Sequence, residues 1–236
     1  MNVIDIRGVI VPDDDLWIYE WFEITATSPR AVRDALDKAG GGHVVVTINS
    51  GGGDVRAGQE IYTLLREYPG SVLISIQSMA ASAAAIIAMA RVSEMSPVAQ
   101  LMIHNVTAGA KGDYRAMEHA AQVLLNSNQA LAAALVEKTG KPEAEILALM
   151  DRETWYTAQQ AVEAGFVDRI AETNRQSTGG AMQLAASFGP GLLPAHAIEY
   201  AKAHFKNNAA AKAAAEYEFL LMEVKQNDQR TVSFQA

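Results

Sequence analysis

The strongest constraint on the fold is a short run, HVVVTIN, at positions 43–49. Its consecutive β-branched apolar residues fit a buried β-strand better than any other regular element. Helical patterns lie on both sides of this run, at about 28–38 and 54–68. Strands and helices that alternate in this way predict parallel βαβ units, and therefore an α/β fold.

The same alternation continues to about residue 170, and then the character of the chain changes. Residues 172–195 are rich in Gly, Ser, Thr and Gln, which is typical of a linker, and residues 196–225 have the composition of an exposed helix. We therefore predict one domain at 1–171 and a helical extension at 172–236. Within the domain we expect strands at 2–11, 72–77, 99–104 and 166–170, and helices at 82–90, 113–138, 142–150 and 157–164.

Composition narrows the function classes. The net charge is −8, and no cluster of Lys and Arg is large enough to bind nucleic acid. The 236 residues include no cysteine, which excludes disulfides and thiol catalysis. No signal peptide and no apolar run of membrane-spanning length is evident, so we expect a cytoplasmic protein that does not bind a membrane. We also expect neither a cofactor nor a metal ion.

A glycine-rich segment, INSGGGD at 48–54, follows the buried strand directly. Glycines allow the backbone to adopt positive φ, and free N–H groups in such a turn can hold an anion or a developing oxyanion. A phosphate-binding P-loop is excluded because no Gly-Lys-Ser/Thr follows. A plain tight turn explains the same residues.

Ser82 is the single polar residue in AASAAA at 80–85, where an expected strand runs into an expected helix. Small neighbours would let a substrate backbone come close, and the N–H of Ala83 would point at the group that Ser82 attacks. The alternative is that Ser82 only caps the helix.

His104 ends the apolar strand LMIHN at 101–105. Side chains at the carboxyl end of a strand in an open α/β sheet commonly face the ligand site. The other four histidines fall in expected exposed helices or at the start of a strand. His104 is therefore the candidate general base, although a histidine at this position can also be purely structural.

Two acids, Asp151 and Glu153, lie in the segment DRETW at 151–155. Acids in a turn are usually solvated, so these two residues alone are weak evidence for a catalytic role. Taken with Ser82 and His104, however, they complete the order Ser, His, acid that a catalytic triad requires.

These segments, in this order, resemble the Clp protease proteolytic-subunit family over about residues 43–170. The family patterns are Asn-Ser-Pro-Gly-Gly, then Ala-Gly and Ile-Tyr, Ala-Ala-Ser-Met-Gly-Ala, Met-Ile-His, and Ala-x-x-Ala-x-x-x-Gly-Leu-x-Asp. They are matched at 49–53, 57–58, 61–62, 80–85, 102–104 and 158–168.

The resemblance implies a crotonase-like fold and peptide hydrolysis through an acyl-enzyme. It implies Ser82 as nucleophile, His104 as general base, and the N–H groups of Gly52 and Ala83 as oxyanion donors. The expected helix at 113–138 matches the family's handle, which implies assembly into homo-oligomeric rings.

The resemblance also places Glu153 at the position of the family's catalytic aspartate, with Asp151 as the alternative third member of the triad. The chain departs from the family at three points: Gly51 replaces a proline, alanines replace the Met-Gly after the serine, and Glu153 replaces the aspartate.

The Glu-Thr-Trp pattern and the long extension resemble the ClpP-related head maturation proteases of tailed phages and prophages. That resemblance implies capsid or scaffold proteins as substrates, and a location in the host cytoplasm or the prohead. The alternatives are a Clp subunit that works with an ATPase unfoldase, and a catalytically idle assembly or scaffolding protein. An acyl-CoA enzyme of the crotonase type is a fourth alternative, but it has no use for this Ser–His pair.

Overall fold

The computed structural model describes residues 2–172 and 192–205. The chain divides into two compact units, 1–192 and 193–236. The described part of the second unit is one helix, α8 (Ala195–Phe205). The predicted linker and the rest of the predicted C-terminal helix lie almost wholly outside the described residues, so the proposed domain boundary near 172 stays a prediction.

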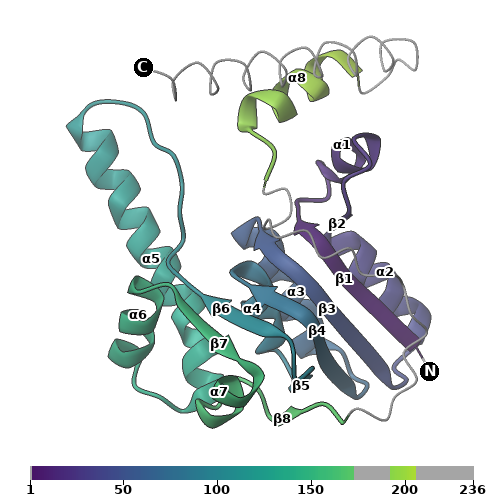
Figure 1. Cartoon of the computed structure of the whole chain (residues 1–236). Helices are drawn as coiled ribbons and strands as arrows, with labels where there is room; N and C mark the ends of the chain where they lie inside the picture. The colour runs from purple at the N-terminus through teal and green to yellow at the C-terminus, as the bar shows by residue number, and fades with distance from the viewer. Residues whose placement is uncertain (1, 173–191, 206–236) are drawn as a thin grey trace, which may run out of the picture. The chain divides into compact units, whose positions relative to one another are not determined.

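The first unit is built on a parallel sheet with the strand order β2-β1-β3-β4-β5-β8 (Figure 1). All of these strands pair in parallel, as the alternating pattern predicts. The strand expected from HVVVTIN is β3, and it lies in the middle of the sheet. The strands are β1 (Asn2–Ile10), β2 (Ala26–Thr27), β3 (Val44–Gly53), β4 (Val72–Ala81), β5 (Val92–Met95) and β8 (Arg169–Ile170).

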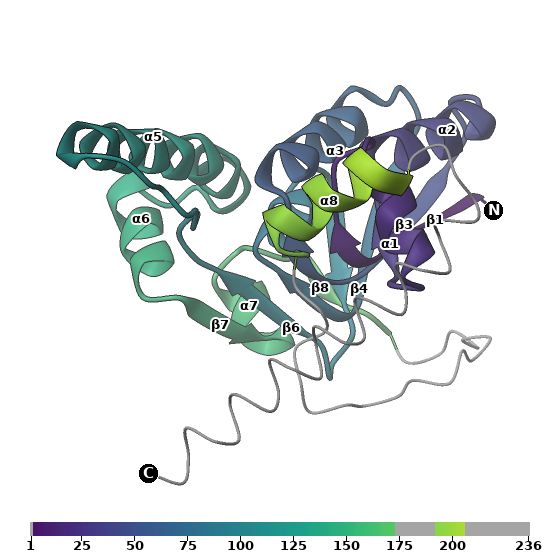
Figure 2. The same cartoon turned by 90° about the horizontal axis from the view of Figure 1, so that it is seen from above.

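Helices α2 (Pro29–Ala39) and α3 (Val55–Glu67) lie next to each other on the same side of the sheet (Figures 1 and 2). In α3 the buried residues recur every four positions, at Ala57, Ile61 and Leu65, because this spacing places them on one face of a helix. The face packs on the apolar side chains of the strands to form the core. The short helix α4 (Ala83–Ala88) is buried at every residue, and α1 (Leu16–Trp21) lies between β1 and β2 in the chain.

After β5, the chain forms a smaller group of strands and helices at the end of β4. Strand β6 (Gln100–Ile103) pairs in parallel with the end of β4 and antiparallel with β7 (Thr154–Thr157). Three helices complete it: α5 (Tyr114–Thr139), α6 (Glu143–Asp151) and α7 (Ala158–Glu163). No helix in the two described stretches is both long and apolar enough to cross a membrane.

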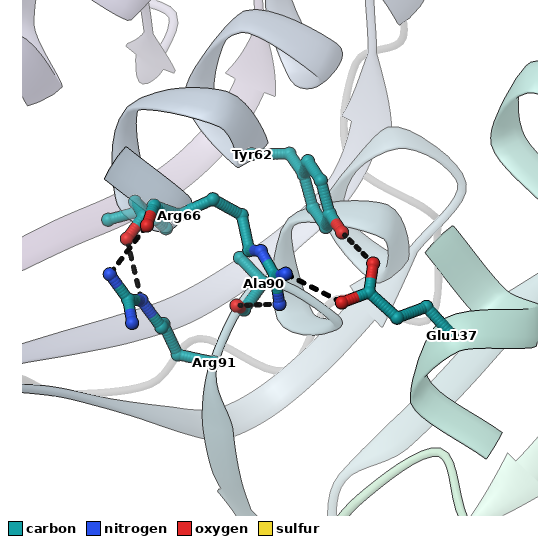
Figure 3. A network of polar contacts seen from close by, with 6 residues as sticks. Tyr62, Arg66, Ala90, Arg91 and Glu137 are labelled. Carbon is teal, nitrogen blue, oxygen red and sulfur yellow. Dashed lines mark hydrogen bonds and ion pairs between the residues drawn. The ribbon is translucent and has the colours of Figure 1, made fainter. Parts of the chain in front are cut away.

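The long helix α5 is anchored only at its C-terminal half, where all of its buried residues lie. Glu137 makes the polar part of this anchor (Figure 3). Arg66 of α3 donates to Glu137 Oε1 at 2.6 Å, and the Tyr62 hydroxyl donates to Oε2 at 3.4 Å. Arg91 donates to the Arg66 carbonyl at 2.6 Å. Burial, and then the charge of Glu137, raise the pKa of Tyr62, so the hydroxyl keeps its proton.

The structure differs from the sequence-based expectation at two places that matter for the site. The expected glycine turn is part of β3, which continues to Gly53 and shifts register against β1 and β4. Gly52 and Gly53 have φ of +98° and +150°, a conformation that glycine adopts without strain, so the strand can bend there without ending. Strand β7, at 154–157, was not expected, and the predicted last strand is reduced to two residues, 169–170.

Candidate active site

Ser82 lies at a sharp junction between β4 and α4, with φ of +55° and ψ of −124°. A non-glycine residue in such a conformation costs on the order of 1–3 kcal/mol and persists only where the surroundings hold it. Here Ala81 and Ala83 are buried, and the Ser82 N–H donates to the Met102 carbonyl at 3.0 Å. The Ser82 side chain makes no capping hydrogen bond to α4, so it does not act as an N-cap.

His104 directly follows β6, and its Nε2 lies 2.8 Å from Ser82 Oγ. The sheet produces this contact, because β6 pairs with the end of β4 through Ala81 and Met102. Two residues that are far apart in the sequence therefore meet where two parallel strands end. For Nε2 to accept the Ser82 proton, the neutral imidazole must carry its own proton on Nδ1.

The glycine segment of β3 lies against Ser82. A methyl group added at Gly52 would come within 2.7 Å of Ser82 Cβ and 3.1 Å of the Ala83 nitrogen. Ala83 is the first residue of α4, and the first N–H groups of a helix have no partner inside it. The two predicted oxyanion residues, Gly52 and Ala83, are thus brought together beside Ser82.

The Gly52 N–H already has a partner, because it donates to Ser50 Oγ at 3.0 Å. The Ser50 hydroxyl in turn donates to the Gly8 carbonyl at 2.6 Å. Gly53, which the sequence analysis did not single out, lines the same pocket as Ser82. An oxyanion bound here would therefore share the Gly52 N–H with Ser50 or use its neighbour Gly53.

The acidic segment lies beside the end of the β6–β7 pair. Thr154 of β7 pairs with Ile103 of β6, so Glu153 and His104 each lie one residue beyond this antiparallel pair. The ladder does not continue through Glu153, which has a φ of +49°. Glu153 is exposed, and its Oε1 accepts a hydrogen bond from Trp155 Nε1 at 3.3 Å. Within the described residues, neither Glu153 nor Asp151 makes a hydrogen bond to His104.

Asn105 is a polar residue of the site that the sequence analysis missed. Its Nδ2 donates to Asp151 Oδ1 at 2.6 Å, and its Oδ1 is buried with no hydrogen-bond partner. The next residue is held as well, because the Val106 N–H donates to Oδ1 of the buried Asn128 on α5 at 2.8 Å. The sequence did contain one signal that could have identified Asn105, because it is a polar residue directly after the strand-end histidine.

A pocket opens beside the Ser82–His104 pair. Its polar side chains are those of Ser82, His104, Asn105 and Thr107. Its other walls are largely apolar and come from α4, α5 and α6, with Ile86, Leu131, Leu135 and Met150 among them. The pair therefore lies where an extended chain could bind with an apolar side chain beside Ser82.

The half-buried serine at a strand-to-helix junction and the strand-end histidine that it contacts form the pair that nucleophilic catalysis by a serine requires. Residues 35–174 match the Clp protease family model, so the chain belongs to the Clp protease family, whose members are serine peptidases. It is 32% identical over 140 residues to the ATP-dependent Clp protease proteolytic subunit 1 of Leifsonia xyli subsp. xyli, covering 58% of this chain and 71% of that protein.

Two further comparisons agree. The chain is 32% identical over 158 residues to the ATP-dependent Clp protease proteolytic subunit of Porphyromonas gingivalis, covering 65% of this chain and 71% of that protein. A mutant of ClpP1 from Listeria monocytogenes has a similar structure, with a TM-score of 0.60 and 20% sequence identity, over 73% of this chain and 92% of that one. The predicted crotonase-like, ClpP-type fold is therefore confirmed.

Proposed function

We propose that this chain is a serine endopeptidase in which Ser82 is the nucleophile and His104 the general base. The observation that carries the proposal is the 2.8 Å contact between Ser82 Oγ and His104 Nε2. His104 takes the Ser82 proton as Oγ attacks the peptide carbonyl, and then gives that proton to the leaving amine. Water activated by the same imidazole hydrolyses the acyl-enzyme and releases Ser82.

The oxyanion of the tetrahedral intermediate needs hydrogen-bond donors beside Ser82. Ala83 and Gly52 are proposed for this role because their backbones lie against Ser82. Glu153 is proposed as the third member of the triad, because Thr154 pairs with Ile103 and so Glu153 and His104 each lie one residue beyond the same pair. To accept the Nδ1–H of His104, Glu153 must turn away from Trp155.

The test of this proposal is turnover of a fluorogenic peptide by the wild type and by Ser82→Ala. The variant is expected to lose nearly all turnover and to keep the wild-type circular dichroism spectrum, because no other group can form the acyl-enzyme. Equal turnover by the two proteins would contradict the assignment.

For the substrate, we propose a capsid or scaffold protein of a phage or prophage, cut in the host cytoplasm or in the prohead. The Glu-Thr-Trp segment at 153–155 and the long chain beyond the family match, which ends at 174, support this subtype. As in the Clp family, the enzyme is expected to work as a homo-oligomeric ring. Co-expression with the capsid and scaffold proteins from the same gene neighbourhood tests the proposal, since cleavage must depend on Ser82.

A second candidate function is that of a proteolytic subunit that partners an ATPase unfoldase. The names of the two relatives described above, which include the term ATP-dependent, support it. Cleavage of a folded capsid or scaffold protein without ATP or a partner would favour the first candidate. Cleavage only with an unfoldase and ATP would favour the second. An idle scaffolding protein would show neither.

A further inference from the structure

Asn105 joins the two segments that carry the proposed base and the proposed acid. It directly follows His104, and its Nδ2 donates to Asp151, two residues before Glu153, at 2.6 Å. In the part of the chain that the structure describes, no other side-chain hydrogen bond links residues 104–107 with residues 151–154. Beyond the β6–β7 pair, the distance between residues 104–107 and residues 151–154 therefore depends on the hydrogen bond between Asn105 and Asp151.

The orientation of the Asn105 amide follows from chemistry. A carboxylate only accepts hydrogen bonds, so the amide nitrogen must face Asp151 and the amide oxygen must face away. That oxygen is buried and has no donor among the described residues. A buried acceptor without a partner is destabilising. The amide of Asn105 therefore makes one side-chain hydrogen bond, to Asp151, and this is the contact that joins the two segments.

We infer that Asn105 is a positioning residue: its hydrogen bond to Asp151 sets the turn that carries Glu153 against the strand end that carries His104. The inference rests on the proposed peptidase function. It also assigns a role to Asp151, which acts through Asn105 and not directly on His104. Asn105 itself takes no part in bond making or breaking.

The first test is Asn105→Leu, with kcat, KM and Tm measured on the full chain. We expect kcat to fall about 100-fold, because a displacement of about 1 Å in a reacting group has an effect of that size. KM should change less than kcat, and Tm should change little, because leucine removes the unpaired oxygen together with the hydrogen bond to the exposed Asp151. Asn2→Leu, at the exposed first residue of β1 and outside the handle helix α5, is the matched control and should behave like the wild type.

Two outcomes of this test would overturn the inference. A wild-type kcat for Asn105→Leu would show that the contact does not affect the reaction. A loss of kcat that is accompanied by a clear loss of Tm would assign Asn105 a structural role.

A swap of the two side chains supplies a second test that does not remove the hydrogen bond. Asn105→Asp alone sets two carboxylates against each other and should lower kcat, because like charges repel at this distance. Combining it with Asp151→Asn restores an amide–carboxylate pair with the roles exchanged, and most of the lost kcat should return. No recovery in the double variant would contradict the positioning role.

The wild type separates failure of this inference from failure of the proposed function. If wild-type protein turns over peptide and Asn105→Leu matches it, only the positioning role is wrong. If the wild type has no Ser82-dependent turnover, the proposed function is wrong and the inference is lost with it.

Discussion

The two sides of the pocket are built in different ways. Ser82 lies between a buried strand and a helix that is buried at all six residues, and it contacts His104 at 2.8 Å. On the other side, Asp151 and Glu153 are exposed; Asp151 ends α6, and Glu153 lies in the short turn between α6 and β7. The nucleophile and the base are therefore held by the core of the fold. The acid depends on local contacts at the surface, such as those with Asn105 and Trp155.

On the buried side of the pocket, which carries Ser82 and His104, the largest effect on kcat is expected from His104→Ala. Removal of the general base should lower kcat by about 10⁶, since loss of a triad histidine costs about that much in a well-studied serine protease. The fold should remain, because His104 follows β6 and is not in it. A fluorogenic peptide assay together with circular dichroism checks this. Turnover within tenfold of the wild type would place the general base elsewhere.

On the exposed side, Glu153→Gln should have the next largest effect. Loss of a correctly oriented acid lowers turnover by about 10⁴ in the best-studied triad. Asp151→Asn should lower it far less, because the asparagine oxygen can still accept the hydrogen bond from Asn105. Comparison of the two variants on one peptide decides between them. The reverse pattern would move the acid to Asp151, and little effect from either would indicate a Ser–His dyad.

Gly52→Ala tests how tightly the buried side is packed around Ser82. The added methyl would lie 2.7 Å from Ser82 Cβ, at a backbone φ of +98°. We expect kcat to fall by about 10², comparable to the loss of one oxyanion donor. Gly51→Ala is the matched control, since its methyl would meet only Met79 Cε at 3.5 Å. Equal kcat in the two variants would show that the glycine segment does not affect the reaction.

The smallest effect concerns stability at low pH. Burial disfavours the charged form of Asp168, but hydrogen bonds from Lys138 and Ser93 outweigh it and hold the pKa of this carboxyl below its usual 3.8. Asp168 therefore stabilises the fold above about pH 4 and loses this effect as the pH falls through its lowered pKa.

Asp168→Asn should accordingly lower Tm slightly at neutral pH, because the contact with Lys138 is partly exposed and screened. The difference in Tm from the wild type should shrink below about pH 4, where the native carboxyl also becomes neutral. A difference that does not change with pH would show that Asp168 contributes through packing alone.

The buried side was largely predictable from the sequence. The run at 43–49 predicted a buried strand, and the local patterns predicted that Ser82 follows one strand and that His104 ends another. The bend in β3 was mistaken for a turn, because glycines that allow positive φ are found in both. Nothing in the local pattern shows that β3 continues to Gly53 with shifted register.

The exposed side was less predictable, because its contacts join distant parts of the chain. Asn105 and Asp151 are 46 residues apart, and no periodicity links them. Strand β7 is only four residues long and pairs with β6, so its existence depends on a tertiary contact. That pairing brings the segments of His104 and Glu153 together. The proposed role of Glu153 in a triad could be inferred from the sequence only through the family resemblance.

The central claim is that Ser82 is an activated nucleophile. A fluorophosphonate probe reacts with such a serine and leaves a covalent adduct whose position can be mapped by mass spectrometry of the digested protein. We predict one adduct, on the peptide that contains Ser82, in the wild type, and its loss in His104→Ala. Failure of the wild type to react, or an adduct on a different serine, would contradict the account.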